Sequence, residues 1–211
     1  KNQTFKDFEV WIMDGNSGIE TKDYLKELEA PFYYQSQKDN GIYDAMNKGI
    51  SLSKGDWLYF LGAGDCFYKE HTLKNVSRFL IDKNKLVLGN SRYDLKTDST
   101  IFRSKFSFLL WIKNTVHHQS LFYNRNIFLN STFDIQYKVL ADYDLNLRLF
   151  KDKLVAVKLD EIISLCDANG VSKKYNWQLY LEEISLKTKN SSILLKPFFY
   201  LLGCFKFLLK K

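Results

Sequence analysis

Cysteine and proline are both scarce in this sequence. The three cysteines, Cys66, Cys166 and Cys204, lie far apart and form no CxxC pair, which excludes a disulfide scaffold and favours a reducing compartment. With only two prolines, no proline-rich linker separates the chain into parts. No signal-peptide pattern opens the sequence, and no internal repeat is evident.

A concentrated basic stripe is also missing, although the formal net charge is +7. Lysine and arginine are spread along the whole chain, and no aromatic RNA-binding motif accompanies them. Because nucleic-acid binders usually gather their positive charge on one element, we expect no nucleic-acid partner. The excess charge instead favours other anionic partners, namely a nucleoside diphosphate and an acidic membrane surface.

The chain of 211 residues, 45% of them apolar, suits one α/β domain with a C-terminal appendage. Apolar patterning predicts strands at residues 8–13, 32–35, 57–61 and 86–89, with helices at 21–29, 41–53 and 72–83 between them. This alternation predicts a mixed, mainly parallel sheet with helices on both faces. Ligands of such sheets lie beyond the carboxyl ends of the strands.

The second half of the sequence is less regular. We expect a two-stranded excursion within residues 91–103, strands at 120–123 and 154–165, and helices at 106–112, 142–150 and 175–189. The predicted domain covers residues 1–170, and residues 171–211 form a C-terminal helical region.

Three acidic residues stand where a strand ends or a helix begins. Asp14 and Asp65 follow predicted strands, and Asp142 opens a predicted helix. Strand-end loops of such a sheet converge on one crevice, so these carboxylates can meet despite their separation in sequence. The alternative for each acid alone is a helix cap or a turn residue.

The surrounding motifs resemble those of family 2 glycosyltransferases of the GT-A fold, in particular enzymes that build bacterial capsule, exopolysaccharide and lipopolysaccharide chains. The resemblance covers about residues 3–170. It is carried by residues 14–17 (DGNS), 38–50 (KDNGIYDAMNKGI), 54–56 (KGD), 60–65 (FLGAGD), 118–119 (HQ), 141–145 (ADYDL) and 147–149 (LRL).

This resemblance implies a site and a reaction. Asp14 would contact the ribose and the base of a nucleotide, uridine or an equivalent, with Asp39 and Asp44 near the nucleotide side. Asp65 would be the last acid of the metal motif, holding Mn²⁺ or Mg²⁺ against the diphosphate. Asp142 would be the general base on the acceptor hydroxyl, in an inverting hexosyltransferase reaction from a UDP-sugar-type donor to a glycan or lipid-linked acceptor.

Elementary chemistry agrees with these roles. A hard divalent cation with oxygen ligands stabilises charge that builds on a departing diphosphate, and a carboxylate on the opposite face can take the proton of the incoming hydroxyl. His118, Gln119 and Asp144 are expected at the substrate or acceptor. Adjacent histidines on a strand point to opposite faces, so His118 rather than His117 should face the site.

The sequence also departs from the family pattern. Gly62 and Gly64 replace acids of the metal motif, so a metal would be held mainly by phosphates and water, although both glycines allow close approach to the diphosphate. The resemblance implies an additional strand and helix before the region that corresponds to Lys1, so we expect part of the nucleotide pocket to be absent from this sequence, either because the natural chain is longer or because the protein is damaged. Because of these departures, a catalytically impaired binding or scaffold protein stays open as an alternative. A second alternative is a nucleotidyltransferase, whose sheet can look similar.

The C-terminal tail, residues 192–211, is rich in Leu and Phe but is interrupted by Lys196, Pro197 and Lys206. It is a poor candidate for a bilayer-spanning helix. A helix lying on a lipid surface fits better, and the alternative is a core-packing or dimer helix. We therefore expect a cytoplasmic protein that binds peripherally to the inner face of the cell membrane.

Overall fold

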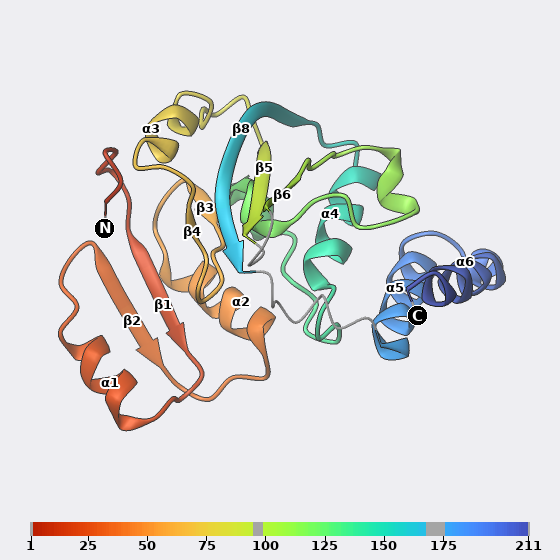
Figure 1. Cartoon of the computed structure of the whole chain (residues 1–211), viewed down its shortest axis with the longest axis horizontal. Coiled ribbons are helices and arrows are strands. Elements are labelled where there is room, and N and C mark those ends of the chain that lie inside the picture. Colours follow the sequence, from red (N-terminus) through yellow and green to blue (C-terminus); the bar gives the residue numbers. More distant parts are fainter. Residues whose placement is uncertain (1, 95–98, 168–175, 211) are drawn as a thin grey trace.

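A computed structural model describes residues 2–94, 99–167 and 176–210 of the chain (Figure 1). Helices surround a curved sheet, and two further strands lie beside it. The arrowheads of β1, β2, β5 and β8 in Figure 1 point in the same direction, so their carboxyl ends lie along one side of the molecule. The candidate site lies on this side.

The first two strands form a separate parallel pair. β1 (Val10–Asp14) pairs with β2 (Phe32–Ser36) in a register that opposes Asp14 and Ser36, and α1 (Ile19–Lys26) connects them. α2 (Ile42–Leu52) packs on β1, where a Cβ on Gly49 would lie 3.4 Å from the Met13 side chain. The predicted strands and helices of this region are confirmed to within a few residues.

The remaining strands form a six-stranded sheet in the order β3-β7-β5-β8-β4, with β6 paired to β5. Its strands are β3 (Trp57–Tyr59), β4 (Cys66–Phe67), β5 (Leu86–Asp94), β6 (Ser99–Phe102), β7 (Leu121–Asn124) and β8 (Ala156–Asp167). Within this sheet only β5 and β8 pair in parallel, among the described residues. The α/β class is confirmed, but the expectation of a mainly parallel sheet is wrong here, because β7 enters between β3 and β5 in the opposite direction.

β5 is longer than predicted, since it continues past Gly89 to Asp94. The register between β5 and β8 shifts on either side of Asn90. A Cβ on Gly89 would lie 2.3 Å from Ile163 Cγ1 and 2.9 Å from the Glu161 carbonyl oxygen. Glycine therefore allows the two backbones to approach at this irregularity, and it does not end the strand. The second half of β5 and β6 form the predicted two-stranded excursion.

The other helices are α3 (Thr72–Ser77), α4 (Ala141–Lys151) and α5 (Trp177–Asn190). α3 is shorter than predicted, and the predicted helix at 106–112 is a short 3₁₀ turn, η1 (Phe108–Trp111). Residue 175, at the predicted start of α5, lies outside the described residues. Two more 3₁₀ turns flank β7: η2 (His118–Ser120) and η3 (Arg125–Leu129).

α4 is buried almost all round. Every residue from Ala141 to Leu147 is buried, and its side chains join the main core with the apolar faces of β5 and β7. A helix so enclosed holds its first turn in a fixed position, which fixes the place of Asp142.

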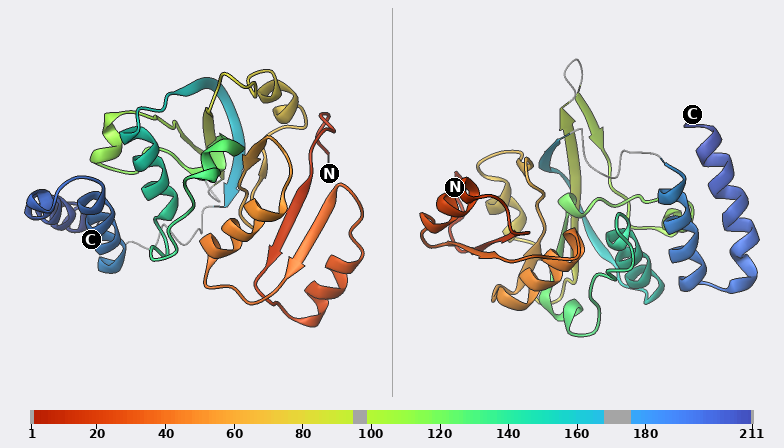
Figure 2. Two further views of the ribbon diagram at one scale, coloured as in Figure 1. Left: turned by 180° about the vertical axis from the view of Figure 1, so that it is seen from behind. Right: turned by 90° about the horizontal axis from the view of Figure 1, so that it is seen from below.

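The C-terminal region is a pair of adjacent helices at one end of the molecule (Figure 2). α6 (Lys196–Leu208), preceded by the 3₁₀ turn η5 (Ile193–Leu195), packs on α5, where a Cβ on Gly203 would lie 3.0 Å from Ile184 Cδ1. α5 in turn contacts α4, and its Leu186 belongs to the main core. No helix of the described residues has the length and apolar run needed to cross a bilayer.

Candidate active site

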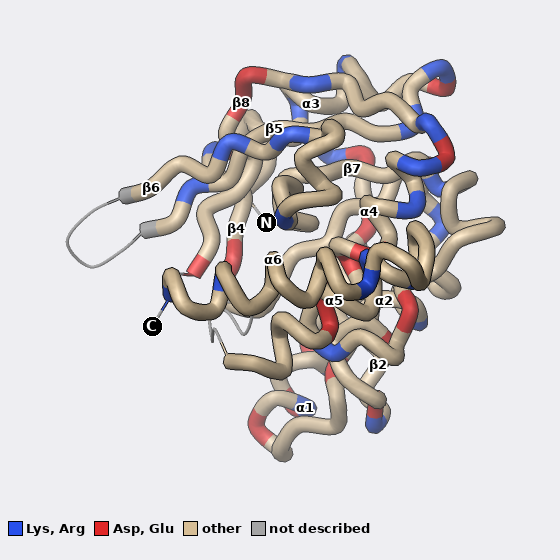
Figure 3. The backbone as a smooth tube through the Cα atoms, turned by 90° about the vertical axis from the view of Figure 1, so that its right-hand side faces the viewer, with Lys and Arg blue, Asp and Glu red and all other residues tan. Residues whose placement is uncertain are grey.

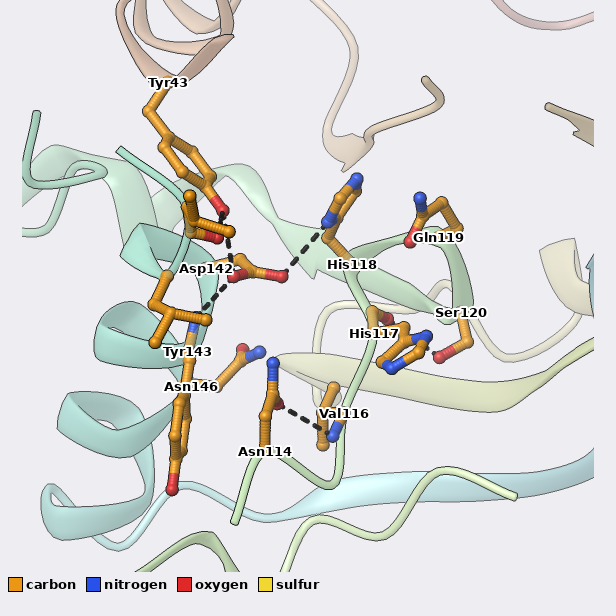
Figure 4. Close-up of polar contacts among 12 residues, drawn as sticks. Tyr43, Asn114, Val116, His117, His118, Gln119, Ser120, Asp142, Tyr143 and Asn146 are labelled. Atoms are coloured by element: carbon orange, nitrogen blue, oxygen red, sulfur yellow. Dashed lines mark hydrogen bonds and ion pairs between the residues drawn. The ribbon is translucent and has the colours of Figure 1, made fainter. Parts of the chain in front are cut away.

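The carboxylate of Asp142 lies at the centre of a hydrogen-bonded group at the start of α4 (Figure 4). Its Oδ2 is 3.1 Å from His118 Nδ1, and its Oδ1 accepts a hydrogen bond of 2.8 Å from the backbone N–H of Tyr143. The hydroxyl of Tyr43, on α2, lies 3.0 Å from Asp142 Oδ1 and 2.7 Å from the Val139 carbonyl oxygen. Only 8% of the Asp142 side chain is exposed.

Asp142 is nevertheless held in its ionised form. Burial acts to raise the pKa of this carboxyl, but the hydrogen bond and the charge of His118, with the Tyr43 hydroxyl, hold its pKa below the ordinary value. Burial and the neighbouring Asp142 raise the pKa of Tyr43 well above its ordinary value, so Tyr43 keeps its proton. Asp142 is therefore a fixed negative charge in a nearly closed environment.

The two adjacent histidines point apart, as predicted, although they stand at the start of η2 and not on a strand. His118 faces Asp142. The His117 ring stacks on Phe102 with centroids 3.7 Å apart and hydrogen-bonds through Nδ1 to the hydroxyl of Tyr93. Of the two rings, His118 alone joins the Asp142 group in Figure 4.

Gln119 connects this group to the second predicted acid. Gln119 Nε2 donates a hydrogen bond of 3.1 Å to Asp65 Oδ2, and the backbone N–H of Asp167 donates one of 2.9 Å to Asp65 Oδ1. The Tyr59 hydroxyl donates to the Gln119 carbonyl oxygen at 2.7 Å. Two consecutive residues, His118 and Gln119, thus bridge Asp142 and Asp65, so the two acids share one side of the sheet, as predicted.

The glycines near Asp65 shape this loop. A Cβ on Gly62 would lie 2.8 Å from Asp65 Oδ2, so glycine leaves room for the carboxylate, and Gly64 has a positive φ of 90°. No group of three His, Cys, Asp or Glu side chains within the described ranges could hold a metal ion. Asp65 supplies one carboxylate, which fits a cation whose other ligands are phosphate oxygens and water.

Asp14 and Asp39 lie close together at the ends of β1 and β2. Asp14 accepts hydrogen bonds from the hydroxyls of Ser17 and Ser36, which lower its pKa. Asp39 Oδ2 is 2.8 Å from the place of a Cβ on Gly15, and Asp39 Oδ1 accepts from the backbone N–H of Gly41 at 2.9 Å. These loops therefore meet at the start of α2, two residues from Tyr43.

The other two predicted acids have structural partners. Asp44 accepts from the backbone N–H of Asn40 at 2.9 Å and pairs with Lys48 at 3.1 Å, in the first turn of α2. Asp144 is fully buried and bound to Arg148 Nε at 2.9 Å and Asn190 Nδ2 at 2.8 Å. The expectation that Asp144 contacts the acceptor is therefore wrong: its side chain points into the α4–α5 contact and joins those helices.

Two residues that support the site escaped the sequence prediction. Tyr43 belongs to the motif at residues 38–50, but nothing in the pattern indicated its contact with Asp142. Glu182 on α5 accepts hydrogen bonds from the backbone N–H groups of Lys138, Val139 and Leu140 at 2.9, 3.0 and 3.2 Å. It holds the segment that leads into α4, and no sequence signal could have identified it.

A cavity of about 400 Å³ lies elsewhere, along the beginnings of β5 and β8. Its lining includes Asn90, Arg103 and Lys158 and contains none of the predicted site residues. Lys158 donates a hydrogen bond of 3.0 Å to the Gly89 carbonyl oxygen, and burial lowers its pKa. The Lys158 side chain therefore stabilises β5 at the point where its register with β8 shifts.

Comparison with known proteins gives consistent matches. The sequence model described as Glycosyl transferase family 2 matches residues 1–144. A "PGL/p-HBAD biosynthesis glycosyltransferase" of Mycobacterium bovis (strain BCG / Pasteur 1173P2) is 33% identical over 199 residues, which span 89% of this chain and 76% of the relative.

Solved structures share the fold at low sequence identity. Staphylococcus aureus TarS residues 1–349, in complex with UDP-GlcNAc, matches with a TM-score of 0.68 and 16% identity over 90% of this chain and 59% of TarS. The mannosyltransferase PcManGT of Pyrobaculum calidifontis, in complex with GDP-Man and Mn²⁺, matches with a TM-score of 0.67 and 15% identity over 94% of this chain and 61% of PcManGT. This chain therefore spans about three fifths of either structure.

Proposed function

The chain belongs to glycosyl transferase family 2 and is a glycosyltransferase, and we propose that it moves a sugar from a nucleoside diphosphate sugar to a hydroxyl group with inversion. The observation that carries this proposal is the continuous connection from Asp65 through Gln119 and His118 to Asp142. It brings an acid suited to the diphosphate next to groups suited to the acceptor. The family match removes the nucleotidyltransferase alternative.

At the donor side we propose that Asp14, Asp39 and Asp44 line the nucleotide region, through the loops that meet at the start of α2. Asp65 would hold Mn²⁺ or Mg²⁺, and the cation would stabilise the negative charge of the diphosphate. We propose a UDP-sugar as the donor because the motifs resemble those of UDP-sugar enzymes. TarS is named in complex with UDP-GlcNAc and PcManGT in complex with GDP-Man. Donor binding is therefore best tested with both UDP and GDP.

At the acceptor side we propose a glycan or lipid-linked hydroxyl. The mycobacterial relative is named for PGL/p-HBAD biosynthesis and not for capsule or lipopolysaccharide. We therefore propose no particular polysaccharide as the acceptor. His118 and Gln119 line this side, and Asp142 takes part in removing the proton. A single displacement at the anomeric carbon inverts its configuration.

Thermal unfolding with added nucleotide tests donor binding. UDP with Mn²⁺ at about 100 times its dissociation constant adds about 2.7 kcal/mol to the unfolding free energy, which raises the melting temperature. Asp65→Asn should reduce the part of the shift that depends on Mn²⁺, while Asp82→Asn, a change in an exposed loop, should not. If neither UDP nor GDP raises the melting temperature with or without Mn²⁺, the chain does not bind the donor, and the scaffold alternative is supported.

Proton NMR of the product tests the stereochemistry. With UDP-GlcNAc or GDP-mannose, both α-linked donors, the released or transferred sugar should first appear as the β-anomer. An initial α-anomer would contradict a single displacement.

We further propose that α6 rests on an anionic lipid surface. Exposed apolar side chains recur every three or four residues from η5 through α6, with exposed fractions of 84% for Leu194 in η5 and of 54, 69, 59 and 69% for Phe198, Leu201, Phe205 and Leu208 in α6. No acidic residue follows Glu183, while six lysines do. Figure 3 accordingly shows no acidic segment along α6. An apolar face bordered by lysines fits a membrane of negative charge, and with it a peripheral location on the inner face of the cell membrane.

Co-sedimentation with vesicles tests this contact. The chain should bind vesicles that contain phosphatidylglycerol more strongly than pure phosphatidylcholine vesicles, and Leu201→Glu with Phe205→Glu should abolish binding. Ile81→Glu, in an exposed loop outside this face, serves as the control. The lipid proposal would be contradicted if the chain bound neither type of vesicle and formed a dimer that the α6 changes disrupt. That result would identify α6 as a dimer helix.

A further inference from the structure

The two carboxylate oxygens of Asp142 have different neighbours. Oδ1 lies 2.8 Å from the backbone nitrogen of Tyr143 and 3.0 Å from the Tyr43 hydroxyl. Oδ2 has one hydrogen-bond partner within the described part of the chain, His118 Nδ1 at 3.1 Å. An ionised carboxylate offers about four acceptor positions over its two oxygens. Oδ1 is therefore the anchored oxygen, and Oδ2 keeps a position for the hydrogen of an acceptor hydroxyl.

The Tyr43 hydroxyl lies between two acceptors. Asp142 Oδ1 is 3.0 Å away and the Val139 carbonyl oxygen is 2.7 Å away, but the hydroxyl has one hydrogen to donate. Burial and the charge of Asp142 raise the pKa of Tyr43 well above its ordinary value, so the hydroxyl keeps this hydrogen. The hydroxyl must therefore choose between the two acceptors.

The charge of Asp142 decides this choice. A hydrogen bond to an ionised acceptor is roughly twice as strong as one to a neutral acceptor, so the charged carboxylate attracts the hydrogen first. Once Asp142 has taken up a proton, Oδ1 is neutral, and the nearer Val139 oxygen becomes the better acceptor. Because an unpaired buried donor is costly, it matters that Tyr43 keeps a partner in both states. Rotation of the O–H bond is enough, and the ring need not move.

We infer that Tyr43 is a positioning residue for the transfer: its hydroxyl holds Asp142 Oδ1 while this base is charged and turns to Val139 after the base has taken the acceptor proton. This rests on the proposed function, in which Asp142 takes part in removing that proton. It adds a separate task for each oxygen, with Oδ1 held and Oδ2 reacting. Figure 4 shows the carboxylate between the Tyr43 hydroxyl and the His118 ring.

The step balances with these groups. The acceptor O–H bond breaks and its proton passes to Asp142 Oδ2, while the acceptor oxygen forms a bond to the anomeric carbon. The bond from that carbon to the phosphate oxygen breaks, and its electron pair leaves with the nucleoside diphosphate. Tyr43 gains and loses no proton, and water later takes the proton from Asp142.

The place of Tyr43 in the fold separates this task from nucleotide binding. It stands in the first turn of α2, two residues after Gly41, whose N–H binds Asp39 on the proposed nucleotide side. The Tyr43 ring is 3% exposed and packs on Phe133 with centroids 5.5 Å apart. Loss of the hydroxyl alone leaves this packing and the loop before it in place. We therefore expect an effect on the chemical step and not on donor binding.

Tyr43→Phe tests the role of the hydroxyl. Release of UDP from UDP-GlcNAc, or of GDP from GDP-mannose, is measured with water as the accepting hydroxyl. Tyr43→Phe should lower kcat by about 10–10²-fold, the effect of a misplaced reacting group, with the donor KM and the thermal shift by nucleotide retained. Tyr123→Phe is the matched control, because it also removes a buried hydroxyl that binds α4, at Asn146 Oδ1. This variant should lose stability but keep the wild-type kcat.

A double-mutant cycle at neutral pH gives a readout without turnover. Tyr43→Phe should lower the urea midpoint more in the wild-type chain, where it removes a bond to a charged acceptor, than in Asp142→Asn, where the acceptor is neutral. Equal losses in the two backgrounds would show that the Tyr43 hydroxyl does not hold the charged carboxylate, and would overturn the inference.

The turnover assay separates this inference from the proposed function. If wild type turns over a donor and Tyr43→Phe matches its kcat, the role of Tyr43 is removed and the transfer stands. An equal fall of kcat in Tyr123→Phe would show a general effect of lost buried hydroxyls, and would also overturn the role of Tyr43. A wild-type chain that binds nucleotide but turns over neither donor removes the transfer itself, and the task of Tyr43 with it.

Discussion

Replacement of Glu182 should damage the site from a distance. This carboxylate, on α5 and only 9% exposed, accepts three backbone hydrogen bonds from the segment that leads into α4. The first turn of α4 carries Asp142. The three N–H groups have no helical partner there, so they depend on Glu182.

The magnitude follows from the partners that each variant removes. A hydrogen bond to a charged acceptor contributes about 1.5–3 kcal/mol, and a buried donor left unpaired costs about 1–3 kcal/mol. Glu182→Gln keeps one oxygen, which can serve Val139 and Leu140, and leaves the Lys138 N–H facing an amide. We therefore expect a loss of about 2 kcal/mol for Glu182→Gln and about 4 kcal/mol for Glu182→Ala, which removes all three acceptors.

Urea unfolding measures both losses, and donor turnover under folding conditions measures the effect on the site. Because the start of α4 moves with this segment, kcat should fall more than KM changes. Glu20→Gln, in the exposed first turn of α1, is the matched control. If Glu182→Ala unfolds at the wild-type urea midpoint with wild-type turnover, Glu182 does not hold the segment and the reasoning is wrong.

Three further changes test other contacts. Gly89→Ala should lower the free energy of unfolding in urea by about 1–3 kcal/mol, because the new Cβ would lie 2.3 Å from Ile163 Cγ1. An unchanged urea midpoint would contradict this expectation and show that β8 can shift to make room for the Cβ. Burial lowers the pKa of Lys187 to about 8, so its folded form releases its proton before the unfolded chain does. Between pH 8 and pH 10 the unfolding free energy of wild type should therefore rise by about 2–3 kcal/mol relative to Lys187→Met, and a constant difference would contradict this. The pKa of Asp142 is lower in the folded protein than in the unfolded chain, so the stabilisation that its charge gives is present above the unfolded pKa and disappears as pH falls through the folded pKa. In a series of melting temperatures at decreasing pH, Asp142→Asn should therefore lose less stability than wild type. Parallel curves for the two proteins would refute the lowered pKa of Asp142.

The local elements follow closely from the sequence. Apolar spacing predicted α2, and the strand-then-acid pattern predicted the turn after β1, because the period of apolar residues and the chemistry of turn residues act within a few positions. Sheet direction was not predictable in the same way. β7 reaches its place between β3 and β5 from a long irregular segment, and pairing direction depends on where that segment returns.

The residues of the candidate site were likewise predictable only in part. The motifs identified Asp65, His118 and Asp142, and the sheet edge predicted that they would meet. Asp144, two positions from Asp142, was expected at the same site, but one hundred degrees of helical rotation per residue turns it toward α5. Only the packed structure separates these two acids.

The sequence by itself determined the family, the order of strands and helices in the first half, and the acids that gather at the strand ends. The tertiary structure alone decided that Asp142 is enclosed by Tyr43 and His118, that Glu182 holds the start of α4, and that Asp144 serves packing. The physical reason is distance along the chain: helix periods and turns depend on neighbours, while burial, ion pairing and the choice of hydrogen-bond partner depend on residues that only the fold brings together.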